Sequence, residues 1–275
     1  MSKPSPAIDG GVARRRFTRA AATYAGASRL EAEVAGRMLE RLDYVKLAPR
    51  RILDAGSGPP GSAVAKRLDK RYPRAQVVSL DFALAMLRAS RTGLFQKKPL
   101  RVCADLGRIP LSDGAVELVW CNMALHWLAE PLGAFREFQR VLAPEGLLMF
   151  STLGPDTLKE LRAAAPERRV HAFTDMHDLG DMLVAAGFSA PVMDMELLTI
   201  DYPQAAGLLA DLRASGQTNA RADRPRGLAG KGFLEKILFK LQNQATFEVV
   251  YGHAWKPAPR SEPAMKTIRV FKPFS

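Results

Sequence analysis

The clearest local signal in this sequence is the run Ile52-Leu53-Asp54-Ala55-Gly56-Ser57-Gly58-Pro59-Pro60-Gly61, in which an apolar segment enters a glycine-rich turn. Residues 62–71 then have the pattern of a helix. A glycine has no Cβ, so the backbone of such a turn can approach a ligand closely, and the start of the next helix offers free N–H groups. The run therefore predicts a strand, a ligand-binding turn and a helix.

Outward from this unit, short apolar segments alternate with helical ones, as in a mostly parallel sheet with helices on both faces. Strands are predicted at residues 51–55, 76–80, 101–104, 116–122, 147–152, 192–202 and 246–255. Helices are predicted within 14–42 and at 62–71, 83–91, 132–142, 156–164, 175–186, 204–214 and 233–241. In such an α/β fold, ligands bind beyond the carboxyl ends of the strands.

Two cofactor classes fit the glycine turn. Gly56, Gly58 and Gly61 satisfy the dinucleotide pattern G-x-G-x-x-G, and Asp81 is placed to hold a ribose, so an NAD enzyme is one reading. Other residues favour S-adenosylmethionine. Asp54 stands two residues before the first glycine, where its carboxylate is placed to reach the amino acid end of that cofactor.

Two further features support the second reading. Pro59 and Pro60 remove N–H donors where a pyrophosphate would need them. Asp105, after the third predicted strand, supplies a carboxylate suited to an adenine amino group, although an ordinary turn residue is as common at that position. The turn thus favours S-adenosylmethionine as the cofactor, and NAD remains the alternative.

Composition limits the class of protein. The chain has 275 residues, 47% hydrophobic and 25% charged, which excludes disorder for most of it. No run approaches the roughly 18 uncharged apolar residues that cross a bilayer, and the start lacks a signal core, so we expect a soluble protein. Cys103 and Cys121 lie in apolar runs without paired spacing, which predicts reduced core cysteines and a cytoplasmic location.

The formal charge of +12 is unevenly distributed. Residues 1–100 contain 20 Lys and Arg against 8 Asp and Glu, whereas residues 101–275 contain 20 of each kind. Such an excess can attract a nucleic acid, an anionic membrane or an acidic carrier protein, or it can be an ordinary solvated surface. Nucleic acid is the weaker reading, because the basic segments lack interleaved aromatic residues.

The spacing of these motifs resembles that of class I S-adenosylmethionine-dependent methyltransferases over residues 54–152. Segments outside this core are similar to the malonyl-acyl carrier protein O-methyltransferases of biotin synthesis, over residues 14–257 in all. Those segments are 17–24, 150–162, 175–181, 209–216 and 249–255. The resemblance implies a Rossmann-like fold with a seven-stranded sheet, and S-adenosyl-L-methionine as cofactor.

Residues 1–12 are rich in Ser, Pro and Gly, which predicts a disordered start, and a flexible tail is expected at 258–275. Between them, the resemblance implies a helical lid at 13–48 and a methyltransferase domain at 49–257, with an α cap inserted at 156–172 and 204–243. The expected cofactor residues are Tyr24, Asp54, Gly56, Gly58, Asp81, Phe82, Asp105, Leu106 and Asn122.

The implied reaction is methylation of the free carboxylate of a malonyl thioester. Such a carboxylate is already ionised at neutral pH, so no catalytic base is expected. The histidines and cysteines have no metal-type spacing, so no metal is expected either. An anion in a dry pocket is best held by an arginine fork, for which Arg162 is the candidate, with His126 and Trp127 beside the acceptor. The basic surface, including Arg14, Arg15 and Arg16 and the later Arg224 and Arg226, would dock an acidic acyl carrier protein.

Two other functions remain open. The same cofactor fold can methylate another small acceptor, such as a quinone, for which the cap would be apolar. The C-terminal motifs also resemble a protein-modifying assembly factor of a respiratory complex. We expect no nucleic acid partner and no stable membrane association in any of these readings.

Overall fold

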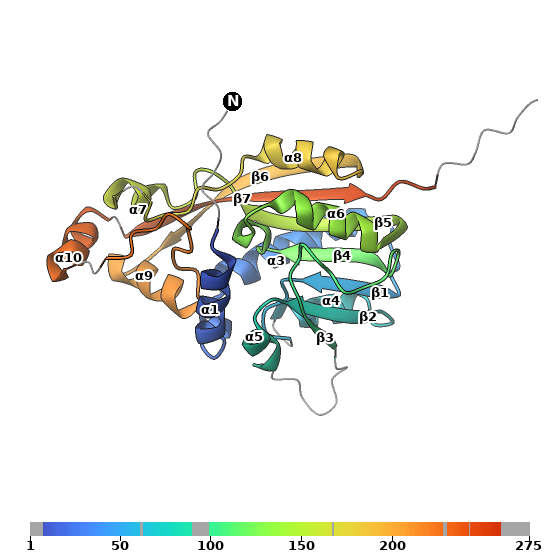
Figure 1. Cartoon of the computed structure of the whole chain (residues 1–275), viewed down its shortest axis with the longest axis horizontal. Helices are drawn as coiled ribbons and strands as arrows, with labels where there is room; N and C mark the ends of the chain where they lie inside the picture. Colours follow the sequence, from blue (N-terminus) through green and yellow to red (C-terminus); the bar gives the residue numbers. More distant parts are fainter. Residues whose placement is uncertain are drawn as a thin grey trace, which may run out of the picture.

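Figure 1 shows the computed structural model of the chain, which describes residues 8–60, 63–89, 99–166, 168–227, 230–241 and 243–259. Gly61, the end of the helix predicted at 83–91 and residues 260–275 of the predicted tail lie outside the described residues. No helix in the described part is long and apolar enough to cross a membrane.

Within the described residues, seven strands form one sheet in the order β3-β2-β1-β4-β5-β7-β6. Neighbouring strands are parallel except at β7, which runs antiparallel to both β5 and β6. The predicted fold class is confirmed. The strands are β1 Arg51–Ala55, β2 Gln76–Asp81, β3 Leu100–Cys103, β4 Val116–Asn122, β5 Leu142–Leu153, β6 Ser189–Asp201 and β7 Gln244–Trp255.

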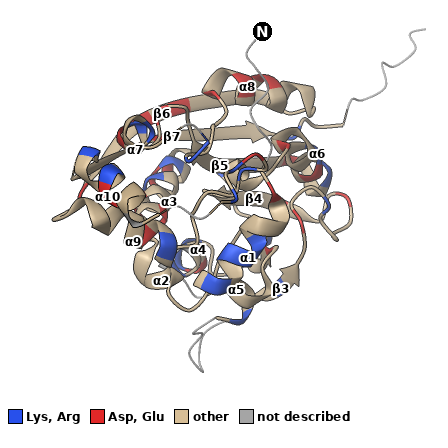
Figure 2. Cartoon of the chain, turned by 60° about the vertical axis from the view of Figure 1, so that its left-hand side comes forward, with Lys and Arg blue, Asp and Glu red and all other residues tan. Residues whose placement is uncertain are grey.

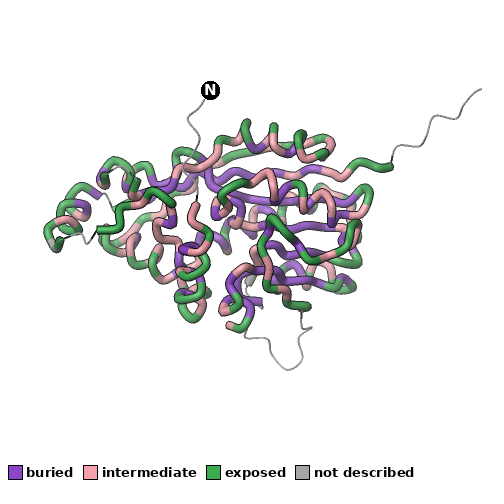
Figure 3. The backbone as a smooth tube through the Cα atoms, viewed as in Figure 1, coloured by how far each residue is buried: buried purple, intermediate pink, exposed green. Residues whose placement is uncertain are grey.

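The central strands are apolar on both faces because helices cover both faces of the sheet. Along β1, Ile52 packs into one core cluster and Leu53 into the other, and both are fully buried. In β4, Trp120 packs into the first of these clusters and Cys121 into the second. Successive side chains of a strand point to opposite faces, so the continuous apolar runs in the sequence correspond to a sheet buried from both sides, as Figure 3 shows.

Different helices cover the two faces. Side chains of α3 and α4 join the first core cluster, whereas those of α6 and α8 join the second. The helices α7, α9 and α10 gather at the far end of β6 and β7, on the left of Figure 1, where a cap was expected. The helices are α1 Gly10–Ala20, α2 Tyr24–Ala27, α3 Arg29–Arg41, α4 Ala63–Arg71, α5 Leu84–Arg88, α6 Pro131–Val141, α7 Lys159–Ala164, α8 Met176–Ala185, α9 Ala205–Ala214 and α10 Lys231–Lys240.

The N-terminal helix starts earlier than predicted. The side chain of Asp9 accepts a hydrogen bond from the Val12 N–H at 3.0 Å and so caps α1. The Asp9 N–H donates to the carbonyl of Ala220 at 2.8 Å. The prediction of a disordered start over residues 1–12 is therefore wrong for residues 8–12, because the cap and this long-range contact order them.

The edge of the sheet corrects another prediction. Cys121 is buried in β4, as expected, but Cys103 is exposed. Within the part of the chain that the structure describes, β3 pairs with β2 alone and ends the sheet, so an apolar run there does not guarantee burial. The Cys103 thiol lies close to the ligand edge of the sheet and lines its cavity.

Candidate active site

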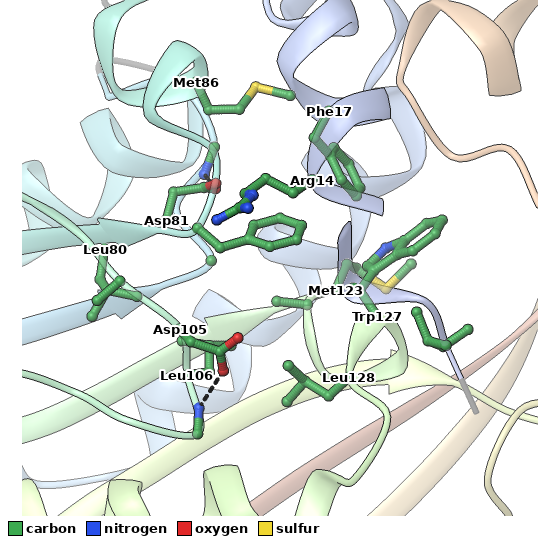
Figure 4. A pocket seen from close by; sticks show the side chains of 18 of the residues that line it. Arg14, Phe17, Leu80, Asp81, Met86, Asp105, Leu106, Met123, Trp127 and Leu128 are labelled. Atoms are coloured by element: carbon green, nitrogen blue, oxygen red, sulfur yellow. Dashed lines mark hydrogen bonds between the residues drawn. The ribbon is translucent and has the colours of Figure 1, made fainter. Parts of the chain in front are cut away.

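A cavity of about 630 Å³ opens at the carboxyl ends of the first four strands, beneath α1 (Figure 4). The loops after β1, β2, β3 and β4 form its floor, and residues of α1, α2 and α3 form its roof. The sequence-predicted residues that line it are Tyr24, Gly56, Gly58, Asp81, Phe82, Asp105, Leu106, Asn122 and Trp127. Asp54, His126 and Arg162 do not line it.

The glycine turn after β1 has a backbone that other residues rarely adopt. Gly56 has a φ of +72°, and a Cβ built there would lie 2.4 Å from the Cβ of Ala124. Gly58 has a φ of +60° and faces the ring of Tyr24. The Gly56 N–H donates to the carbonyl of Leu80 at 2.8 Å, which holds the turn against the end of β2. The turn thus combines a left-handed backbone, which glycine adopts without strain, with a close approach.

Asp81 ends β2 and holds the turn from the other side. Its Oδ2 accepts from the Gly58 N–H at 3.0 Å, and its Oδ1 accepts from the Ala83 N–H at 2.8 Å. The residue is only 5% exposed, and this burial outweighs the hydrogen bonds and raises the pKa of the carboxyl to about 6. The structure places a buried carboxylate directly beside the cavity.

Asp54 lies behind the turn rather than in the cavity wall. Burial is the main cause that raises its pKa to about 7, and the nearby carboxylates of Asp81 and Asp69 raise it further. The role of Asp54 toward the amino acid end of the cofactor stays a prediction. Its carboxyl is part of an acidic group under the turn. Burial is the main cause that raises the pKa of the Tyr24 hydroxyl, and the charges of Glu31, Asp81 and Asp54 raise it further.

The third strand ends at a tight turn. The Oδ1 of Asp105 accepts from the Gly107 N–H at 2.8 Å, shown as a dashed line in Figure 4. Asp105 is exposed toward the cavity, whereas the adjacent Leu106 is buried. The two residues offer a polar and an apolar surface side by side. Phe82, from the loop after β2, faces the same cavity.

The loop after β4 connects the cavity floor to α3. The Asn122 Nδ2 donates to the carbonyl of Glu31 at 3.0 Å, and its Oδ1 accepts from Ser151 Oγ at 2.9 Å. The Glu31 side chain accepts from Gln217 Nε2, and burial raises the pKa of the Glu31 carboxyl. Both Glu31 and Gln217 line the cavity but were missed in the sequence, where a lone Glu within an apolar stripe carries no ligand signal.

Aromatic rings form the roof. The Phe17 ring of α1 meets Trp127 at 5.0 Å between centroids, nearly perpendicular, and meets Phe82 at 5.8 Å. Tyr24 lies 6.4 Å from Phe17 and covers the glycine turn. Trp127 is only 8% exposed, which fits the expected role of a pocket wall. The roof therefore closes the cavity with apolar surface and one hydroxyl.

A second cavity of about 190 Å³ shares Trp127 and Gln217 with the first. His126 and His171 line it, and burial lowers the pKa of His126 to about 3 and that of His171 to about 4. Both rings are therefore neutral at neutral pH. The Nδ1 of His126 lies 3.4 Å from Thr152 Oγ1, and this contact holds the ring against β5.

Arg162 is not in either cavity. It lies on the exposed side of α7, and its Nη2 donates to the carbonyls of Pro155 at 3.2 Å and Thr157 at 3.1 Å. Both carbonyls belong to the turn just before α7, so the guanidinium bonds to the segment that leads into its own helix. The expectation that Arg162 faces the acceptor is corrected, because the guanidinium folds back onto its own chain.

Relatives and structures with the same fold are known. Residues 53–150 match the family model described as a methyltransferase domain. The YcgJ protein of Bacillus subtilis has a TM-score of 0.58 at 17% identity, over 82% of this chain and 98% of that one. The [4+2]-cyclase SpnF has a TM-score of 0.53 at 18% identity, over 82% of each chain. These structures share the fold, but a shared fold does not fix the reaction.

The sequence relatives are much closer. A malonyl-[acyl-carrier protein] O-methyltransferase of Methylovorus sp. is 48% identical over 94% of this chain and 93% of its own. Those of Gallionella capsiferriformans and Legionella pneumophila are 49% and 42% identical over 92% and 90% of this chain, and 93% and 90% of their own. Similarity of this extent covers the sheet, the roof and the cap together. The chain belongs to the malonyl-[acyl-carrier protein] O-methyltransferase family.

Proposed function

We propose that the chain transfers a methyl group from S-adenosyl-L-methionine to the free carboxylate of a malonyl thioester carried on acyl carrier protein, in the cytoplasm and as an early step of biotin synthesis. The observation that carries this proposal is the roofed cavity at the carboxyl ends of β1 to β4 in a chain of this family. Relatives of this name favour neither a quinone acceptor nor an assembly factor.

The cavity fits the cofactor. Gly56 and Gly58 form a cradle that a Cβ would fill or strain, and the buried Asp81 carboxylate accepts hydrogen bonds, as ribose hydroxyls require. Asp105 and Leu106 offer a carboxylate and an apolar surface for an adenine ring. A bound cofactor supplies an electrophilic methyl group on a sulfonium.

The other end of the cavity suits the amino acid part of the cofactor. Gln217 donates to the Glu31 carboxylate there and Asn122 to the Glu31 backbone carbonyl, and Tyr24 lines the same cavity. Asp54 is buried behind the turn, from where its carboxyl would act on this end of the cofactor through the turn or through water. An NAD enzyme is less well supported, because Pro59 and Pro60 have no N–H groups to offer a pyrophosphate.

The chain's own residues act by positioning. A malonyl carboxylate is ionised at neutral pH, so no side chain has to remove a proton. His126 is neutral and bonded to Thr152, and its role is to shape the acceptor side. Phe17 and Trp127 exclude water from the methyl group, which strengthens the effect of alignment.

The N-terminal segment is proposed as a lid, and the cap as the cover of the acceptor side. Arg14, Phe17, Tyr24 and Glu31, all within residues 13–48, line the cofactor cavity. Residues of the proposed cap segments 156–172 and 204–243 line the second cavity. Removal of the lid would open the roof to solvent.

The carrier protein is proposed to dock beside α1, where Figure 2 shows Lys and Arg positions. The structure reduces the number of arginines that are available for this docking. Arg14 lines the cofactor cavity, Arg16 has a buried Nη1, and Arg224 pairs with Asp9 at 3.3 Å, so these three are not free surface charges. The exposed Arg15 and Arg19 on α1, together with Arg226, remain for an acidic partner.

A panel of acceptors tests the proposal. The protein is incubated with S-adenosyl-L-methionine and with malonyl, acetyl or succinyl thioesters of the same acyl carrier protein, and each carrier is measured by intact mass. We expect one added methyl group on the malonyl carrier and none on the acetyl carrier, which has no free carboxylate. Cofactor binding without methylation of the malonyl carrier would contradict the proposed acceptor.

A further inference from the structure

The second cavity adjoins the cofactor cavity and is lined by positively charged side chains. It shares Trp127 and Gln217 with the larger cavity and draws its wall from the loop after β4, the segment before α8 and the loop after α9. Among the described residues that line it are Arg169 and Arg213, and no Asp or Glu. The two histidines there are neutral. The charge of the cavity therefore comes from guanidinium groups and favours an anion.

Arg169 is held in place but not fully bonded. Its guanidinium carbon lies 4.7 Å from the centre of the Phe233 ring, which fixes the side chain from α10. Its Nε is buried and has no hydrogen-bond partner among the described residues. A buried donor without an acceptor destabilises a folded protein, and such groups are rare unless a ligand completes them.

The neighbouring arginines are already bonded. Arg162 donates to backbone carbonyls of its own helix start, and Arg221 donates to both carboxylate oxygens of Asp223 at 2.8 and 2.9 Å. Arg168 lies 3.7 Å from the same carboxylate. Arg169 differs from all three because it combines a cavity-lining position with an unsatisfied N–H.

We propose that this cavity is the acceptor subsite, and that Arg169 holds the carboxylate of a short dicarboxylic half-thioester there. The assignment rests on the proposed function and adds to it the residue that selects the acceptor. A guanidinium binds a carboxylate through parallel N–H donors. A carboxylate has about four lone-pair sites, so an oxygen held in this way keeps a lone pair for the methyl carbon beyond Trp127.

The reaction is balanced without a proton. The carboxylate oxygen forms a bond to the methyl carbon as the bond from that carbon to the sulfonium sulfur breaks, and the electron pair stays on a neutral thioether. The product ester carries no charge, so Arg169 no longer attracts it. His171 remains a neutral wall, because its Nε2 accepts from the Ala220 N–H at 2.7 Å. The same arginine thus selects the acid and favours release of the ester.

The test compares binding of an acid and its methyl ester. A small malonyl thioester and its methyl ester are titrated by calorimetry into the protein saturated with S-adenosylhomocysteine. We expect the wild type to prefer the acid by about 10- to 100-fold. Arg169→Gln should lose this preference, whereas Arg168→Gln, a matched change at the next residue, should keep it.

Three outcomes overturn the assignment: an unchanged preference in R169Q, an equal loss in Arg162→Gln, or an equal loss in R168Q. If R169Q also fails to bind S-adenosylhomocysteine, Arg169→Lys decides instead, because it keeps the charge and stem but loses the planar fork. Its preference should then fall, and an unchanged value refutes the assignment. Failure of the proposed function looks different, since wild-type protein would then bind S-adenosylhomocysteine and show no preference for the acid.

Discussion

The ring of Phe17 meets the ring of Trp127 edge to face, with 5.0 Å between their centroids, and so joins the first helix to the loop after β4. These residues are far apart in the sequence, yet together they roof the cofactor cavity. The contact means that the cavity is complete only when α1 is docked. Ligand binding and the position of α1 are therefore coupled.

Removal of this contact should open the roof. Phe17→Ala is expected to lower the free energy of unfolding by about 2 to 4 kcal/mol, and to raise the Kd for S-adenosylhomocysteine about tenfold or more as water enters. Urea unfolding and calorimetry measure the two effects. Phe239→Ala is the control, because Phe239 is 93% exposed on α10. Equal effects of both changes would contradict the roof.

The glycine turn should not tolerate a methyl group. Gly56→Ala places a Cβ 2.4 Å from that of Ala124 at a φ of +72°, so cofactor binding should be lost and stability reduced by more than about 1 kcal/mol. Gly26→Ala serves as the control, since nothing lies within 4 Å of a Cβ there. Cofactor affinity is measured by calorimetry. A wild-type Kd in the Gly56 variant would show that the turn does not form the cradle.

Much of this fold could be predicted from the sequence, for a physical reason. The buried strands are continuous apolar runs ended by Gly, Asp or Asn, and β1 and β4 have the predicted bounds. β5 begins earlier than predicted, at Leu142, because that residue pairs with Val116 across an irregular register. Exposure of Cys103 followed from strand order, which a local pattern does not contain.

The site was predictable mainly where the ends of the parallel strands build it. Gly56, Gly58 and Asp81 follow from the ends of neighbouring strands, since parallel strands bring their carboxyl ends to one edge. The contact between Glu31 and Gln217 joins residues 186 positions apart and has no local signal. Arg162 and Arg169 look alike in the sequence, and only the fold shows which one bonds to its own helix.

The acidic group under the turn should make stability depend on pH. The native pKa of Asp54 is about 7, above its usual 3.8, so the native state holds the proton more tightly than the unfolded state. The tighter proton binding by native Asp54 stabilises the fold fully below about pH 4. As the pH rises to about 7 this stabilisation is lost, and the free energy of unfolding falls by about 2 to 4 kcal/mol. Asp81, with a native pKa of about 6, acts in the same direction.

Asp54→Asn should remove most of that dependence. Urea unfolding of the ligand-free protein between about pH 5 and 8 is expected to show a steep fall in stability for the wild type and a shallower one for the variant, with the variant more stable at the alkaline end. Parallel curves would show that Asp54 is ionised throughout. Asp113→Asn, at an exposed position, is the control and should leave the slope unchanged.

Charge reversal should separate docking from chemistry. The double variant Arg15→Glu, Arg19→Glu is expected to raise the KM for malonyl-acyl carrier protein about 5- to 20-fold and to leave the KM for a small malonyl thioester unchanged. Both arginines are exposed on α1. Arg74→Glu is the control, because Arg74 is exposed just before β2, at the amino ends of the strands and therefore away from α1. An equal rise for both substrates would contradict docking at α1.

In the proposed reaction, a carboxylate on the carrier protein receives the methyl group. The most direct test uses S-adenosyl-L-methionine labelled in its methyl group, with malonyl-acyl carrier protein and malonyl-coenzyme A as parallel acceptors. We expect label on the carrier substrate that mild base releases as methanol, because a carboxyl methyl ester hydrolyses readily. Label that resists base, or cofactor binding with no label on the malonyl carrier, would contradict the account.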